Sequence, residues 1–112
     1  MSLFRKTTHL SEILEESEKQ PVTIFKYSND CGSSARLAEK LKKEMLNTEC
    51  LTFGKPEPII YQITVQREPV LSEKIAEWFQ IRHETPQIIV VEKGKAIYTA
   101  SHSQIKVQDF LP

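Results

Sequence analysis

Cys31 stands where a strand-type segment gives way to a helix-type segment, and that position suits a thiol to nucleophilic chemistry. Residues 22–27 are rich in β-branched and aromatic side chains, and an amphipathic helical pattern begins just after Cys31. A helix N-terminus has free backbone N–H groups and the positive end of the helix dipole, which favour negative charge. Because the thiolate is the nucleophile in thiol chemistry, this position predicts a reactive cysteine.

The residues around Cys31 predict a redox site with one thiol. The segment reads Asn29-Asp30-Cys31-Gly32-Ser33-Ser34, so Ser34 occupies the place of the second cysteine in a C-x-x-C motif. The adjacent carboxylate of Asp30 should disfavour the thiolate. We expect the helix terminus to prevail, so that the pKa of Cys31 falls below the free value of ~8.5.

The second cysteine, Cys50, is expected to be a bystander. A helix over about 32–46 would separate it from Cys31 by roughly 20 Å, whereas a disulfide needs Cα atoms within about 7 Å. We therefore predict no 31–50 disulfide. The two cysteines and three histidines show no paired ligand spacing, so we predict no metal site.

Hydrophobic periodicity predicts the elements that position Cys31. Predicted helices cover about 8–19, 31–46, a segment that starts at Pro69, and 103–110; predicted strands cover 22–27, 59–65, 87–91 and 96–100. Residues 47–58 are expected to form a loop, and 92–95 a hairpin turn. Ser101 or Ser103 could cap the last helix. Trp78 and Phe79 fall on an apolar stripe and are expected in the core.

This order of elements predicts an α/β fold with a four-stranded mixed sheet. Strands joined through a helix should be parallel, and the last two should form an antiparallel hairpin. With a cysteine after the first strand and Thr85-Pro86 before the hairpin, the chain is similar to the thioredoxin fold with an additional N-terminal helix. That similarity implies a cis peptide before Pro86, in a loop that faces Cys31. We expect one thioredoxin-like domain over residues 1–112.

Three segments narrow the resemblance to one family. Residues 26–34 (KYSNDCGSS), 82–87 (RHETPQ) and 101–105 (SHSQI) resemble the YtxJ-like monothiol bacilliredoxins. The resemblance implies a thiol–disulfide oxidoreductase that removes bacillithiol from S-bacillithiolated proteins. Its co-substrate would be bacillithiol, with no bound cofactor, and bacillithiol or another thiol reductant would recycle it.

The resemblance and the local chemistry together predict the site residues. Cys31 is the predicted catalytic nucleophile, and the predicted substrate- and thiol-binding residues are Asn29, Gly32, Ser33, Ser34, Thr85 and Pro86. Lys26 and Arg36 are basic side chains that could meet the carboxylates of bacillithiol. His83 could approach the sulfur, although a solvated surface histidine is the more usual interpretation.

Two other functions fit parts of the same pattern. Monothiol glutaredoxins also place Cys-Gly before a residue and Ser, so the chain could carry an iron–sulfur cluster or a low-molecular-weight thiol. Their usual Gly-Gly-x-Asp-type segment is missing, and residues 100–103 read ASHS instead. The remaining alternative is a non-catalytic thioredoxin-like binding module with an unreactive Cys31.

Composition limits the partners. Fifteen basic and fifteen acidic side chains give a formal net charge of zero, so a broad nucleic-acid footprint is not expected. No stretch approaches the ~20 apolar residues of a membrane span, and the N-terminus lacks the apolar region of a signal peptide. We therefore expect a cytoplasmic protein that binds neither nucleic acid nor membrane.

Overall fold

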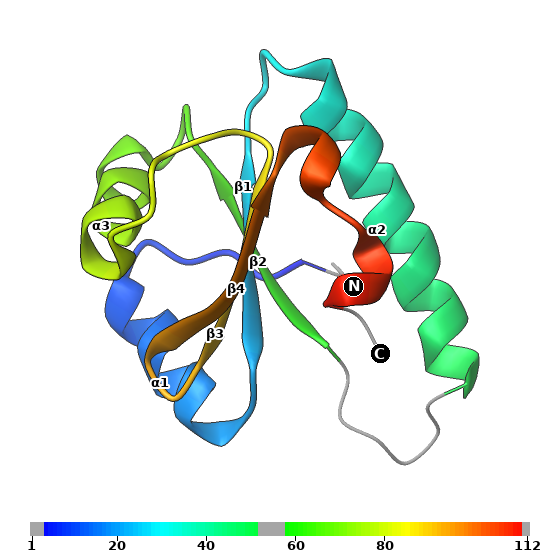
Figure 1. The fold of residues 1–112 in the computed structure, drawn as a ribbon, viewed down its shortest axis with the longest axis horizontal. Coiled ribbons are helices and arrows are strands. Elements are labelled where there is room, and N and C mark those ends of the chain that lie inside the picture. Colours follow the sequence, from blue (N-terminus) through cyan, green and yellow to red (C-terminus); the bar gives the residue numbers. More distant parts are fainter. Residues whose placement is uncertain (1–3, 52–57, 111–112) are drawn as a thin grey trace.

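A central mixed β-sheet with helices on both faces organises the protein (Figure 1). The computed structural model describes residues 4–51 and 58–110, with side chains described for 4–46 and 58–110. Its elements are α1 (Leu10–Lys19), β1 (Val22–Tyr27), α2 (Gly32–Leu51), β2 (Ile59–Thr64), α3 (Pro69–Phe79), β3 (Gln87–Glu92) and β4 (Lys95–Ser101), followed by 3₁₀ turns at His102–Gln104 and Val107–Asp109. In the described ranges, no helix has the length and apolarity to cross a membrane.

The strand order β2-β1-β3-β4 places β1 in the middle of the sheet. Strand β1 pairs in parallel with β2 and antiparallel with β3, and β3 pairs antiparallel with β4. Lys93 and Gly94 close the hairpin with φ of 50° and 77°, the backbone that a two-residue type I′ turn requires. The predicted mixed sheet of the thioredoxin fold is confirmed.

Each face of the sheet buries its own apolar cluster. Helices α1 and α3 cover one face, where Ile13, Leu71 and Ile75 pack on residues of β1, β2 and β3. Helix α2 covers the other face (Figure 1), and its buried side chains pack on Phe25 and on Val107 of the C-terminal turns. Because β1 is covered on both faces, five of its six side chains are buried.

The segment before α1 adds a short pairing at the free edge of β2, which the sequence did not predict. Arg5 forms a parallel bridge with Tyr61. Its N–H donates to the carbonyl of Ile60 at 2.8 Å, and its carbonyl accepts from the N–H of Gln62 at 3.0 Å. These bonds hold the N-terminal chain along the sheet and so fix the next residue, Lys6, beside β2.

Helix α2 is longer than predicted. It continues to Leu51, whereas the sequence predicted its end at about residue 46 and a loop from 47. No glycine or proline interrupts residues 47–51, so nothing there opposes continued helix. The rest of the predicted loop, residues 52–57, lies outside the described residues.

The predicted C-terminal helix over 103–110 is wrong. Two 3₁₀ turns stand there, separated by extended backbone at Ile105 and Lys106. The extended link lets Val107 reach the core, where it is 3% exposed. Neither proposed cap is observed: Ser101 Oγ instead accepts a hydrogen bond from Gln87 Nε2 at 3.3 Å, and no side chain caps the turn.

Trp78 is also not a core residue. Its side chain is 59% exposed, whereas Ser72 on the same helix is 3% exposed. At about 100° per residue, the buried face of α3 is centred between Leu71 and Ser72, which leaves Trp78 at its edge. Phe79 packs partly buried against the core, as predicted.

Candidate active site

Cys31 lies directly before the first residue of α2, at the end of the loop that follows β1. Its N–H donates to the carbonyl of Ser28 at 3.2 Å, and its carbonyl accepts from the N–H of Ser34 at 3.1 Å. The side chain is half-buried, with Sγ 3.1 Å from Ser33 Oγ and 3.9 Å from the carbonyl oxygen of Thr85. The thiol is therefore at a helix N-terminus and faces the loop before β3, as predicted.

Hydrogen bonds around the sulfur lower the pKa of the Cys31 thiol from its ordinary value. The largest contribution comes from the Ser33 hydroxyl, followed by the backbone N–H and the hydroxyl of Ser34; the backbone N–H of Ser33 adds to them, and desolvation of the sulfur opposes them. Both N–H groups belong to the first turn of α2, and that of Ser34 also donates to the Cys31 carbonyl at 3.1 Å. The predicted direction of the shift is confirmed, and the Ser33 hydroxyl adds a contributor that the helix terminus alone did not predict.

The Asp30 carboxylate does not act on the thiol in the way that the sequence predicted. It is not among the groups that shift the pKa of Cys31, and the opposing contribution is desolvation. Asp30 Oδ2 instead accepts a hydrogen bond from Gln66 Nε2 at 3.4 Å. Gln66 belongs to the connection after β2. Its bond to Asp30 could not be predicted from the residues next to Asp30 in the sequence.

Gln66 holds the loop of residues 28–31, the cysteine loop, in place. Sequence reasoning missed this residue. Its Nε2 donates to Ser28 Oγ at 2.8 Å, and its Oε1 accepts the N–H of Asn29 at 3.0 Å. With the bond to Asp30, one amide thus bonds three consecutive residues of the loop from 36, 37 and 38 positions away in sequence. Its only sequence signal is its place directly after the second strand, in the connection that returns past the end of β1.

Ser34 fastens the start of α2 to the same loop. Its side chain is fully buried, and its Oγ accepts the N–H of Ser28 at 3.3 Å. A cysteine here would be the second thiol of a dithiol motif. The hydroxyl instead has two observed effects: it holds the loop, and it lowers the pKa of Cys31.

Hydrogen bonds at both ends hold the loop of residues 82–86, which faces the sulfur. The peptide between Thr85 and Pro86 is cis, as predicted. The carbonyl of Pro86 accepts the N–H of His102 at 3.0 Å, and the carbonyl of Arg82 accepts Gln87 Nε2 at 2.8 Å. These bonds fix both ends of the five-residue segment whose Thr85 carbonyl faces Cys31.

Lys26 supports the loop of residues 82–86 from inside the protein. The prediction that this lysine contacts the carboxylates of bacillithiol is therefore corrected. The side chain is fully buried, and Nζ donates to the carbonyl of Ser72 at 2.9 Å. Nζ also lies 3.1 Å from His83 Nδ1. Burial lowers the pKa of Lys26 to about 8. Burial, and then the Lys26 charge, lower the pKa of His83, which favours the neutral ring that can accept this hydrogen bond.

The other candidate residues lie around the loop without direct contact to the sulfur. Asn29 and Gly32 are exposed, and open space surrounds the position that a Cβ of Gly32 would take. Arg36 is exposed on α2. The side chain of Cys50 lies outside the described residues, so the absence of a 31–50 disulfide stays a prediction, although the helix between them is observed.

The fold and the thiol site define a thiol–disulfide oxidoreductase of the thioredoxin fold. Residues 3–110, nearly the whole chain, match the family described as monothiol bacilliredoxin BrxC. The chain therefore belongs to the monothiol bacilliredoxin family and acts in thiol–disulfide exchange. The family resemblance deduced from the sequence is confirmed.

Solved structures agree on the fold. A thioredoxin-fold protein of proposed oxidoreductase activity superposes with a TM-score of 0.74 at 24% identity, covering 95% of this chain and 88% of that one. Mitochondrial thioredoxin 3 from Saccharomyces cerevisiae gives a TM-score of 0.64 at 16% identity, with 87% and 81% covered. Thioredoxin from Plasmodium falciparum gives 0.60 at 17% identity, with 88% and 84% covered.

The contacts of the sulfur generate a prediction for Ser33. Replacing Ser33 with Ala should raise the pKa of Cys31 towards the ordinary thiol value, because the largest lowering contribution is lost. Ser33→Thr, which keeps a hydroxyl, should restore most of the shift. The pH dependence of iodoacetamide alkylation, measured in a Cys50→Ala background, reports this pKa. An unchanged midpoint in Ser33→Ala would contradict the assigned hydrogen bond.

Buried Lys26 generates a prediction for the pH dependence of stability. Between pH 8 and 10.5 the unfolded lysine keeps its proton while the folded lysine has lost it, so the free energy of unfolding should rise with pH over this window. Lys26→Met lacks the titrating group and should lose this rise. Urea unfolding at each pH gives the free energy of unfolding of both proteins. The difference between wild type and Lys26→Met cancels the contribution of the tyrosines, which titrate in both proteins. A flat difference would contradict the lowered pKa.

Proposed function

We propose that this protein removes bacillithiol from S-bacillithiolated proteins through Cys31. The observation that supports this most directly is the arrangement of the sulfur. It is half-buried at the start of α2, has a lowered pKa, and faces the Thr85 carbonyl at 3.9 Å, with a serine where a dithiol enzyme would have its second cysteine. The reaction belongs to the cytoplasm, where thiols are kept reduced.

The proposed step exchanges one disulfide for another. The Cys31 thiolate attacks the bacillithiol sulfur of the client mixed disulfide. A bond forms between Cys31 and bacillithiol as the client–bacillithiol bond breaks, and the client sulfur leaves with the electron pair and takes a proton from water. One disulfide is lost and one is gained, so the step needs no separate oxidant or reductant.

The loop before β3 would position the client. Thr85 is half-buried beside the sulfur, and the hydrogen bonds at Arg82 and Pro86 hold its segment in place. A client chain that lies against Thr85 would bring its modified cysteine to Cys31. In this proposal Asn29, Gly32 and Ser33 face the client from the opposite side, and the hydroxyls of Ser33 and of buried Ser34 stabilise the attacking thiolate.

A second thiol must complete the cycle. Ser34 cannot attack the Cys31–bacillithiol disulfide, because a hydroxyl is a far weaker nucleophile than a thiolate towards sulfur. Bacillithiol or another thiol reductant would attack instead. With bacillithiol, the products are free Cys31 and bacillithiol disulfide, so the electrons come from the reducing thiol.

The proposal predicts which cysteine the activity requires. With an S-bacillithiolated client and excess bacillithiol, Cys31→Ser should reduce release of the client thiol to the uncatalysed rate, because the nucleophile is lost. Cys50→Ser is the matched control and should keep a rate close to wild type. Client thiol release can be followed by intact mass.

Two outcomes would contradict the proposal. One is a Cys31→Ser variant that retains the wild-type rate, which would favour the non-catalytic binding module. The other is a wild-type protein that releases no client thiol, although its Cys31 is shown to alkylate readily. Circular dichroism of both variants establishes that each has the native fold.

A further inference from the structure

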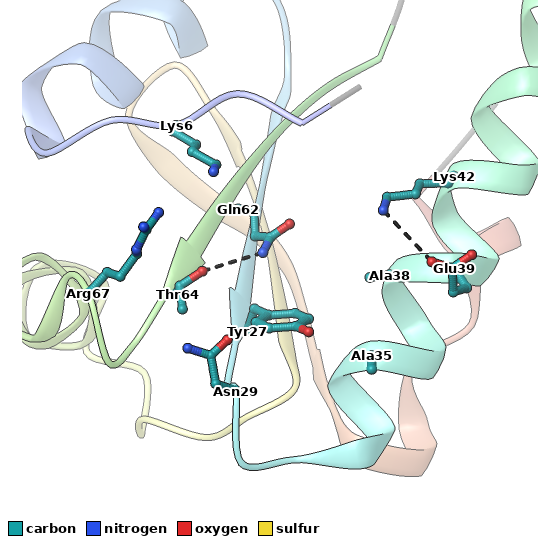
Figure 2. Close-up of a pocket in the computed structure, with 10 residues that line it drawn as sticks. All are labelled: Lys6, Tyr27, Asn29, Ala35, Ala38, Glu39, Lys42, Gln62, Thr64 and Arg67. Carbon is teal, nitrogen blue, oxygen red and sulfur yellow. Dashed lines mark hydrogen bonds and ion pairs between the residues drawn. The ribbon is translucent and has the colours of Figure 1, made fainter. Parts of the chain in front are cut away.

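A polar pocket lies beside the cysteine loop, between α2 and the free edge of β2 (Figure 2). Its volume is about 480 Å³. Ten residues line it: Lys6, Tyr27, Asn29, Ala35, Ala38, Glu39, Lys42, Gln62, Thr64 and Arg67. Asn29 is two residues before Cys31, and Cα atoms two residues apart are at most about 7 Å apart. The Cα of Asn29, in the pocket lining, therefore lies within about 7 Å of the Cα of Cys31.

The lining is basic in a chain whose formal net charge is zero. It contains three cations, Lys6, Lys42 and Arg67, and a single carboxylate, Glu39. Glu39 lies 3.8 Å from Lys42 Nζ and partly neutralises that cation. Within the described residues, Lys6 and Arg67 form no ion pair. Two cations thus face the pocket without a protein counter-charge, which favours an anionic occupant.

Main-chain hydrogen bonds fix the backbone from which these two exposed side chains extend. Lys6 follows Arg5, whose pairing with the edge of β2 sets it beside Gln62. Arg67 stands in the turn that ends β2, where its N–H donates to the carbonyl of Thr64 at 3.0 Å. In Figure 2 both cations lie along β2, and Lys42 reaches in from α2 on the opposite side.

Small and uncharged side chains give the pocket its room and its remaining contacts. Ala35 and Ala38, one turn apart on α2, present only methyl groups across from the sheet. Tyr27, Gln62 and Thr64 contribute a hydroxyl, an amide and a second hydroxyl (Figure 2). Such groups can pair with carboxylates and with the hydroxyls of a sugar.

We infer that this pocket receives the carboxylate-bearing end of an anionic low-molecular-weight thiol while the sulfur of that thiol is joined to Cys31. The inference rests on the proposed function and adds a recognition site to it. Lys6 and Arg67 pair with the carboxylates, and the polar groups of β1 and β2 contact the rest of the molecule. Asn29, which lines the pocket two residues before Cys31, belongs to the loop that joins the two.

The test compares an anionic with a neutral disulfide. Second-order rates of Cys31 modification are measured by intact mass, with bacillithiol disulfide and with hydroxyethyl disulfide, in a Cys50→Ala background. Lys6→Gln combined with Arg67→Gln should slow the reaction with bacillithiol disulfide roughly 2- to 30-fold, as expected for two exposed ion pairs. The rate with hydroxyethyl disulfide should stay unchanged, because that reagent has no charge to recognise.

The matched control removes two positive charges outside the pocket. Lys40 and Lys43 are exposed on α2 and do not line the pocket, so Lys40→Gln combined with Lys43→Gln should leave both rates unchanged. An equal loss in this control would mean that overall charge governs the rate, and would overturn the inference. A pocket variant that slows both disulfides alike, or neither, would also overturn it.

A titration without a thiol separates the pocket from the proposed function. Succinate should shift the backbone amide resonances of Tyr27, Gln62 and Thr64 in the wild type and not in the Lys6→Gln/Arg67→Gln variant. If wild-type Cys31 reacts with hydroxyethyl disulfide but not with bacillithiol disulfide, the proposed function fails, and the succinate result alone decides the carboxylate site. Absence of these shifts in the wild type would overturn the site.

Discussion

The first turn of α2 is the constraint on which the thiol site depends. Hydroxyl and backbone N–H groups of Ser33 and Ser34, at this helix start, lower the pKa of the Cys31 thiol. They act only if the preceding loop holds Cys31 at the start of α2. The buried Ser34 hydroxyl, which accepts the N–H of Ser28, ties that loop to the helix. One serine therefore both positions the thiol and stabilises its anion.

The sheet brings two further loops to this point. Gln66 bonds the cysteine loop from the end of β2, and Lys26, buried under α3, bonds His83 in the loop that faces the sulfur. The lysine lies on the central strand, so its ammonium is desolvated, and its pKa falls to about 8. Polar contacts from Lys26 on β1 and from Gln66 after β2 thus hold the loops of the site, and the start of α2 lowers the pKa of Cys31.

The sequence predicted the features that depend on local pattern. Apolar runs with β-branched and aromatic residues placed the strands, helical spacing placed the first three helices, and the strand–Cys31–helix order placed the thiol. Contacts distant in sequence were not predictable in this way. Nothing in Gln66 alone points to Ser28, and a lysine in a strand gives no sign of being buried. Trp78 and residues 103–110 were mispredicted because tertiary packing overrode a helical pattern. The buried face of α3 is centred away from Trp78, and the chain is extended at Ile105.

The central claim is that Cys31 attacks the bacillithiol sulfur rather than the client sulfur. A single turnover with equimolar S-bacillithiolated client and no reductant tests it directly, with both proteins weighed intact and the modified cysteine located by peptide mapping. The account predicts bacillithiol on Cys31 and a free thiol on the client. A Cys31–client disulfide with released bacillithiol, or bacillithiol on Cys50, would contradict it.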